Sequence, residues 1–250
     1  MGKVIKMPAN EKYVKEIVED YEALSERCTE VQVVKGNADV QDIVLHLKNT
    51  IRAHSDMIGL SANQIGYDKR ILCLNFNGDI RTFVNPIITN AGDMELSREK
   101  CHSIPGKEFI RTRHSKVSVT FQTPLGKIES VDLMGVAARV FQHHLDHLDG
   151  LLLSDVSLEI DIDFDEATDE ERQEVIDMYL DSLDLAMAEI EKEIEADPDA
   201  KKMSDAIKFI NSVRSGETEI ETVELTEEEA EALGLKEKED TSEQQSDAEE

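Results

Sequence analysis

The chain has 250 residues, of which 40% are hydrophobic and 33% charged, and its formal net charge is −28. This length and composition suit one large domain, or one domain with an extension, and the acidic excess argues against nucleic acid as a partner because phosphates would be repelled. The start of the chain has no apolar leader, no apolar run approaches 18 residues, and there are only three cysteines. We therefore expect a cytoplasmic protein with free thiols and no membrane span.

The negative charge is concentrated near the end of the chain. Residues 155–250 hold 8 Lys and Arg against 35 Asp and Glu, whereas residues 1–154 hold 19 against 20. A nearly neutral globular part is therefore followed by a strongly acidic part. We predict a metal-binding domain over residues 1–156, an acidic helical extension over residues 157–235 and a disordered acidic tail over residues 236–250.

The apolar pattern predicts two helices and then several strands. Helical spacing indicates helices over residues 10–26 and from Ala38 to His54, followed by a turn-rich stretch. "KRILCLNF" and "RTFVNPII" are typical of strands, the second interrupted by Pro86 at an edge or bulge. "KVSVTFQ" and "GKIESVDL" predict a hairpin around Gly126. The helical period returns from about Gly135 to Gly150, so the order predicts an α+β fold in which an antiparallel sheet packs on this helix.

The acidic extension also carries helical signals. Thr168 and Glu171 form a capping-box pattern, which predicts the start of a long helix with one apolar face. A second helix is expected from Met203 to Val213 and a short third one from Thr226. These apolar stripes indicate ordinary packing rather than a special binding face.

Three histidines within five positions mark a candidate metal site. His143 and His147 in "QHHLDHLDG" are four residues apart, so a helix presents both to one ion. Cys101, which is flanked by polar and turn residues, is the candidate third ligand, with a fourth position left open. Cys73 lies in an apolar strand and is expected to pack in the core. A structural metal site and a thiol hydrolase that uses Cys101 with His143 remain alternatives.

Three motifs together resemble the peptide deformylases. "IGLSANQIG" (Ile58–Gly66), "EKCHSIPG" (Glu99–Gly106) and "QHHLDHLDG" (Gln142–Gly150) are similar, in this order, to the family patterns G-x-G-L-A-A-x-Q, E-G-C-L-S and Q-H-E-x-D-H-L. The resemblance covers about residues 28–155. It implies removal of the formyl group from N-formylmethionine at the start of nascent polypeptides, by metal-bound hydroxide.

The resemblance also implies roles for individual residues. Cys101, His143 and His147 would ligate one divalent ion, Fe²⁺ or Zn²⁺. The Gln64 side chain and the backbone N–H of His102 would stabilise the oxyanion. Asp146 would orient part of the ligand-bearing helix. The substrate-binding edge would be formed by Ile58, Gly59, Leu60 and Lys100.

The departures from the family patterns bear on activity. His144 occupies the position of the catalytic Glu, and a neutral imidazole can act as a base, but a nearby cation disfavours the imidazolium that would form. Ordinary activity, altered activity and a non-catalytic metal-binding homologue that binds peptides or a partner therefore all remain open. A solvated or core position for His144 and a turn-forming role for Gln64 are the competing interpretations. Smaller departures are Met57, Ser61, Lys100 and His102.

A further alternative is that the acidic extension carries the function, by binding a basic protein partner.

Overall fold

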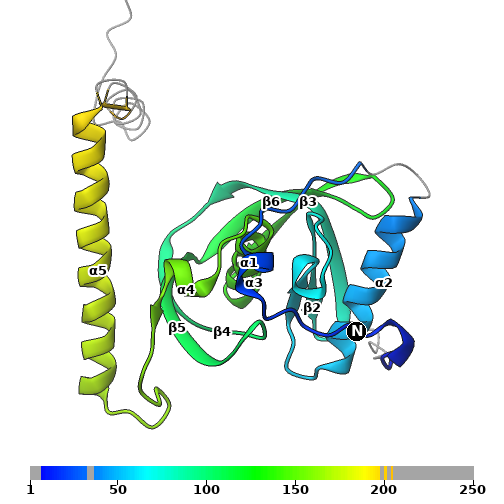
Figure 1. Cartoon of the computed structure of the whole chain (residues 1–250), viewed down its shortest axis with the longest axis horizontal. Coiled ribbons are helices and arrows are strands. Elements are labelled where there is room, and N and C mark those ends of the chain that lie inside the picture. Colours follow the sequence, from blue (N-terminus) through cyan, green and yellow to red (C-terminus); the bar gives the residue numbers. More distant parts are fainter. Residues whose placement is uncertain (1–6, 33–36, 198–199, 202–203, 205–250) are drawn as a thin grey trace, which may run out of the picture. The chain divides into compact units, whose positions relative to one another are not determined.

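The computed structural model describes residues 7–32, 37–197, 200, 201 and 204, and these residues form an α+β fold with two antiparallel sheets. The larger sheet has the order β1-β2-β3-β6-β7, and Figure 1 labels its strands β2, β3 and β6. Its strands are β1 (Gly59–Ser61), β2 (Ile71–Phe76), β3 (Asp79–Ala91), β6 (Lys116–Gln122) and β7 (Ile128–Met134). The register of β3 on β6 shifts between Val84 and Ile87, on either side of Pro86, as the sequence predicts. The hairpin around Gly126 is also confirmed by the pairing of β6 with β7.

The smaller sheet consists of β4 (Met94–Cys101), β5 (Ile104–His114) and β8 (Leu158–Glu159), in that order. The strand pattern of the sequence did not reveal the β4–β5 hairpin, because polar and charged residues dominate β4. The hairpin forms nonetheless, with Met94 paired to His114 and Cys101 paired to Ile104 across a tight turn.

Helix α3 (Val136–Leu148) carries the three histidines and contacts both sheets. It packs against β1, β2 and β7 of the larger sheet and against β5 of the smaller one. Phe141 of α3 lies in one apolar cluster with Phe83 and Phe121, and all three are fully buried. Helix α2 (Ala38–Ala53), as predicted, buries Leu47 and other apolar residues against β1 and β2. The histidine helix is thus fixed between two layers.

The helix predicted over residues 10–26 is wrong. This stretch holds only the 3-10 turn η1 (Glu11–Tyr13) and the single-turn helix α1 (Tyr21–Leu24), with extended chain between them. The Lys15 N–H donates to the Thr50 hydroxyl of α2, and the Val18 N–H donates to the Gln64 carbonyl. Because tertiary partners satisfy this backbone, the local helical pattern does not decide its conformation.

Helix α5 (Asp169–Ala196) begins at the predicted capping box. The Glu171 N–H donates to the Thr168 hydroxyl, and the Glu171 carboxylate accepts from the Thr168 N–H. Its first half packs on the domain, because Tyr179 is buried in a cluster with Ile110 and Ile160. One compact unit therefore extends over residues 1–183, beyond the domain end expected at residue 156.

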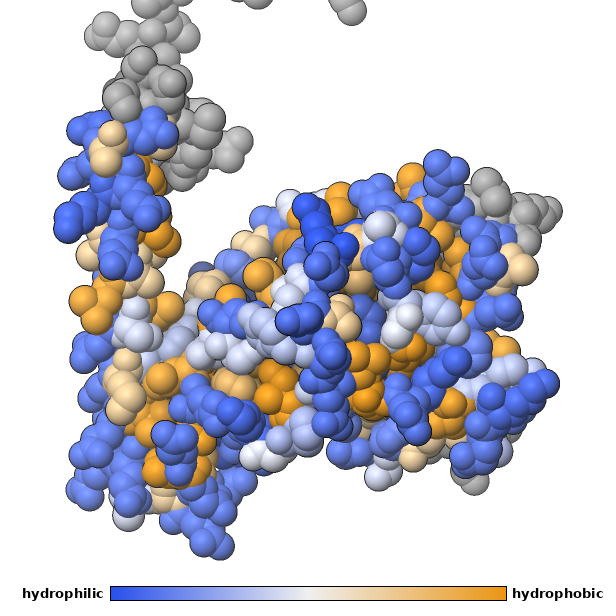
Figure 2. All heavy atoms as spheres, in the orientation of Figure 1, coloured by the Kyte–Doolittle hydropathy of each residue, from blue (hydrophilic) through white to orange (hydrophobic). Residues whose placement is uncertain are grey.

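A second unit covers residues 184–250. Its described helical part exposes Leu185, Met187 and Ile190. Figure 2 shows hydrophobic (orange) residues among hydrophilic (blue) ones along this helix. The helices predicted at Met203–Val213 and from Thr226, and the tail over residues 236–250, lie outside the described residues. Of the helices that are described, none combines the length and apolar character needed to cross a membrane. The two short elements not yet given are η2 (Asn63–Ile65) and α4 (Leu153–Val156).

Candidate metal centre

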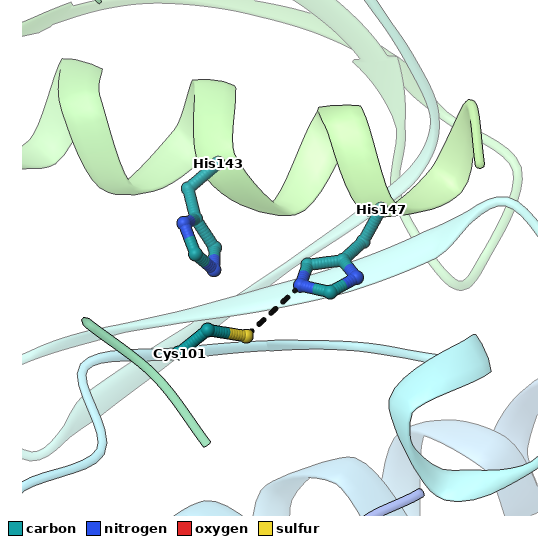
Figure 3. Close-up of side chains that lie close together, drawn as sticks. All are labelled: Cys101, His143 and His147. Carbon is teal, nitrogen blue, oxygen red and sulfur yellow. Dashed lines mark hydrogen bonds between the residues drawn. The ribbon is translucent and has the colours of Figure 1, made fainter. Parts of the chain in front are cut away.

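Cys101, His143 and His147 come together as the sequence predicts (Figure 3). All three are buried, and one potential ligand atom from each lies within 4.8 Å of the other two. The distance from Cys101 Sγ to His147 Nε2 is 3.2 Å. A thiolate and an imidazole on the same tetrahedral ion lie roughly 3.5 Å apart, given ligand bonds of about 2.3 and 2.05 Å. The donors and their spacing therefore fit one transition-metal ion.

Two structural elements position these ligands. The turn between β4 and β5 follows Cys101 directly and places its thiol beneath α3. The C-terminal end of α3 is held by Arg70, which donates to the Leu148 carbonyl and to the Asp149 carboxylate. The Asn63 amide also donates to the carbonyl of His147 at 2.6 Å. The helix end is therefore anchored by protein contacts.

The ionised thiol of Cys101 suits metal binding, and an ion bound there displaces a proton from His143. Burial opposes ionisation of Cys101, but hydrogen bonds and charge from His143 and His147 lower its thiol pKa to about 5. Burial likewise disfavours the charged form of His143, yet its bonds to Cys101 and Glu99 raise its pKa to about 9. A thiolate is the form of cysteine that ligates metals. By contrast, burial raises the pKa of Cys73 to about 11, in line with its predicted place in the core.

A buried ionic network supports the ligands from behind. The Glu99 carboxylate accepts from His143 Nδ1 at 3.0 Å, which leaves His143 Nε2 for an ion. Arg113 donates to both oxygens of Glu99 and also to Asp146 of α3. Arg111 donates to the same Asp146 oxygen at 2.9 Å. Partners of this kind fix the orientation and tautomer of a metal-bound imidazole.

This network was missed in the sequence, apart from Asp146. Glu99 stands two residues before Cys101 within the second motif, so it shares the strand face of the ligand. Arg111 and Arg113 are also two residues apart and point to one face of β5. The alternation of charged residues along the two strands could have revealed this network. It could be used only once the β4–β5 hairpin was known, and the hairpin was not predicted.

Gln64 lies at the site and its amide orientation is fixed. Its Oε1 accepts from the Ser61 N–H at 3.1 Å and from the Ser61 hydroxyl at 2.9 Å. Because a backbone N–H can only donate, the oxygen must face Ser61 and the NH₂ group must face the other way. That group lies 3.2 Å from the Ser103 hydroxyl and 3.7 Å from the Cys101 sulfur. Gln64 therefore binds its own loop and also presents a donor beside the thiol.

His144 is buried against the backbone of β1. A Cβ atom at Gly59 would overlap the His144 ring, so only glycine leaves room for this imidazole. Burial and the surrounding positive charges hold the His144 pKa well below its usual value, and its Nδ1 has no hydrogen-bond partner among the described residues. His144 is therefore a neutral, mostly buried imidazole at the wall of a cavity.

The cavity beside the ligands has a volume of about 390 Å³. Of the residues expected at the substrate edge, Ile58, Gly59 and Lys100 line it, and so does His102. The side chain of Leu60 instead packs in the core. Met57 is also in that core rather than in this cavity, so its replacement of a glycine does not narrow the site.

Comparisons with known proteins agree with this architecture. Residues 14–161 match the family model described as polypeptide deformylase. The peptide deformylase of Pelotomaculum thermopropionicum is 36% identical over 129 residues, which cover 52% of this chain and 81% of the relative.

Two solved structures are also similar. The peptide deformylase of Thermotoga maritima has a TM-score of 0.52 and 29% identity, covering 57% of this chain and 95% of that one. The deformylase of the Vibrio parahaemolyticus bacteriophage VP16T, solved in complex with actinonin, has a TM-score of 0.50 and 33% identity, covering 55% and 98%. With its three motifs gathered at one buried Cys-His-His cluster, this chain belongs to the peptide deformylase family.

Proposed function

We propose that this chain removes the formyl group from peptides that begin with N-formylmethionine. Peptide deformylases use a divalent metal ion, and the observation that carries the proposal is the buried cluster of Cys101, His143 and His147, which adjoins a cavity. Three protein ligands leave a position open for water or substrate, as in catalytic rather than structural sites. A divalent cation in such a site lowers the pKa of bound water and polarises a carbonyl oxygen.

The free edge of β1 supports peptide binding. β1 is the end strand of its sheet. The Ile58 carbonyl accepts from Asn75, and the Ala62 N–H donates to Ile71, so both groups point toward β2. In an antiparallel pair these directions alternate, which turns the N–H and C=O of Gly59 away from β2. An extended peptide can pair with such an edge and lie along the cavity.

Three residues would act on the reacting groups. The Gln64 NH₂ group, turned toward the cluster by Ser61, would donate to the oxyanion that develops on the formyl carbonyl, together with the His102 N–H. His144, neutral at physiological pH, would accept the proton of the attacking water and return it to the leaving amine. Its low pKa makes it a weak base, which predicts slow turnover.

The direct test measures formyl-Met-Ala-Ser hydrolysis under anaerobic conditions, with metal content determined on the same sample. We expect turnover by the native protein, and a gain of about 10²–10⁴-fold in His144→Glu, because a well-placed carboxylate base contributes this much. A changed pH profile with little gain would instead show that His144 is as effective a base as a carboxylate at this position.

Two controls separate the competing functions. A chelator should abolish turnover, whereas turnover that survives chelation and is lost on alkylation of Cys101 would favour a thiol mechanism. A non-catalytic homologue would bind formyl peptide, or actinonin as the phage relative does, without turnover. If neither the native protein nor His144→Glu, each carrying its metal, binds or hydrolyses formyl peptides, the proposed function is refuted.

A further inference from the structure

The wall of the cavity beside the Cys101, His143 and His147 cluster includes one basic residue, Arg139, that has no acidic partner among the described residues. Val136, Arg139, Val140, His143 and His144 line the cavity from one face of α3, at spacings of three and four residues. Arg139 is half-buried. In the part of the chain that the structure describes, its guanidinium forms no ion pair or hydrogen bond. A half-buried arginine whose guanidinium has five unused donors is a ready site for an anion.

The other charged groups of the wall are already engaged. Arg98 binds Glu108 at 2.7 Å and Asp165 at 2.8 Å, and Lys100 lies 3.7 Å from the same Glu108. Both carboxylate oxygens of Glu99 already accept hydrogen bonds, from Arg113 and His143. None of these acids is available to Arg139.

The remaining acid of the wall, Asp56, lies with its carboxylate 3.2 Å from His102 Nε2, and its side chain is 77% exposed. A divalent ion on Cys101 would add further positive charge, since one thiolate offsets only half of it. The cavity therefore attracts an anionic group.

The position of Arg139 limits where that anion can be. Arg139 precedes His143 by four residues, which is about 6 Å along the helix axis. An extended peptide advances about 3.3 Å per residue. A carboxylate bound by Arg139 therefore belongs within about two residues of the formyl group. The apolar part of such a side chain would contact Val136, Val140 and Ile58, which lie in the same wall.

We propose that Arg139 makes this enzyme selective for formylmethionyl peptides with an acidic side chain at the second residue. The inference rests on the proposed deformylase function and adds the substrate class. The carboxylate would form charge-assisted hydrogen bonds to the guanidinium, while the formyl group lies at the cluster of Cys101, His143 and His147.

The experiment compares amidated peptides, so that no terminal carboxylate competes: formyl-Met-Ala-Ser, formyl-Met-Glu-Ser, formyl-Glu-Ala-Ser and formyl-Met-Lys-Ser. With the metal-loaded full chain, kcat/KM should be about tenfold higher for formyl-Met-Glu-Ser than for formyl-Met-Ala-Ser, and lower for formyl-Met-Lys-Ser than for either. Formyl-Glu-Ala-Ser tests the position: if it is preferred over formyl-Met-Glu-Ser, the acid belongs at the first residue and the inference is overturned.

In Arg139→Leu the ratio of acidic to neutral peptide should fall to about one, and in Arg139→Glu the lysine peptide should overtake the acidic one. The matched control is Lys48→Leu, which removes a half-buried basic residue of α2 that does not line the cavity and should leave the ratio unchanged. Metal content of each variant is measured alongside. A native enzyme that treats all four peptides alike, or a preference that persists in Arg139→Leu, overturns the inference.

Calorimetric binding of the same peptides separates this inference from the proposed function. Binding of an acidic peptide that depends on Arg139, without turnover of any peptide, would refute the function but retain the acid site. Turnover without any charge preference would retain the function and refute the acid site. Absence of both binding and turnover would refute both.

Discussion

The two faces of strand β5 are both buried, but by opposite means. Arg111 and Arg113 point toward α3, where they bind Asp146 beneath the metal centre. Ile110, which alternates with them, points to the other side and packs with Tyr179 of α5. At Arg111 and Arg113 the face toward α3 is closed by ion pairs, whereas at Ile110 the opposite face is closed by apolar contact.

The difference teaches how each face responds to change. A buried ion pair adds little net stability while it is complete, but loss of one partner leaves an unpaired buried charge, which costs several kcal/mol. Apolar packing instead loses free energy roughly in proportion to the area and volume removed. On the β5 face toward α3, loss of a single charged partner should therefore lower the free energy of unfolding sharply. On the face toward α5, the loss should grow gradually with the size of the side chain removed.

The largest expected effect is loss of the metal. The purified protein should hold about one transition-metal ion per chain, and Cys101→Ala should lower the content to near zero, because two imidazoles alone bind an ion weakly. Metal analysis after dialysis measures this. The matched control is Cys73→Ala, which removes an equally buried thiol from the core and should retain the ion. Unchanged metal content in Cys101→Ala would show that the site is misassigned.

Next is the ionic network. Arg113→Met should lower the free energy of unfolding by about 3–5 kcal/mol, because Glu99 and Asp146 lose their shared partner while Glu99 stays buried. Urea denaturation measures this. Arg81→Met, which removes the half-exposed pair with Glu129, should cost less than about 1 kcal/mol. Equal losses in the two variants would contradict a special role for the buried network.

On the other face, Tyr179→Ala should cost about 2–4 kcal/mol, since it removes a ring from the cluster with Ile110 and Ile160. It also removes the hydroxyl that accepts from the Thr112 N–H at 2.7 Å. Denaturation should show this loss with the metal content unchanged. Tyr21→Ala, at a 55% exposed tyrosine, is the control. Release of the metal in Tyr179→Ala would mean that the two faces are coupled.

The smallest expected effect is at the start of α5. Thr168→Ala removes the side chain that caps the Glu171 N–H, and N-cap losses of this kind cost about 1 kcal/mol. The thermal midpoint should fall by a few degrees, with no change in turnover. If Thr168→Ala lowers the free energy of unfolding as much as Tyr179→Ala does, the cap rather than the apolar cluster stabilises this face.

The sequence determined the elements whose signals are local. The i, i+4 spacing of His143 and His147 requires only a helix, and α3 is a helix because its apolar positions follow the same period. Helix α2, strands β2, β6 and β7, and the cap of α5 were likewise predicted from short-range patterns. The motif around Cys101 indicated the third ligand without any knowledge of the hairpin that carries it.

Tertiary structure decided the rest. Residues 10–26 have a helical pattern, yet α2 and Gln64 bind their backbone in other conformations. The β4–β5 hairpin is rich in charged residues, which are stable inside only because Glu99, Arg113 and Asp146 meet from three elements. His144 is neutral because Gly59, far away in sequence, leaves room for its ring in a buried position. Local spacing selects a helix or a strand, but burial and charge pairing depend on which residues become neighbours, and only the folded chain sets those neighbours.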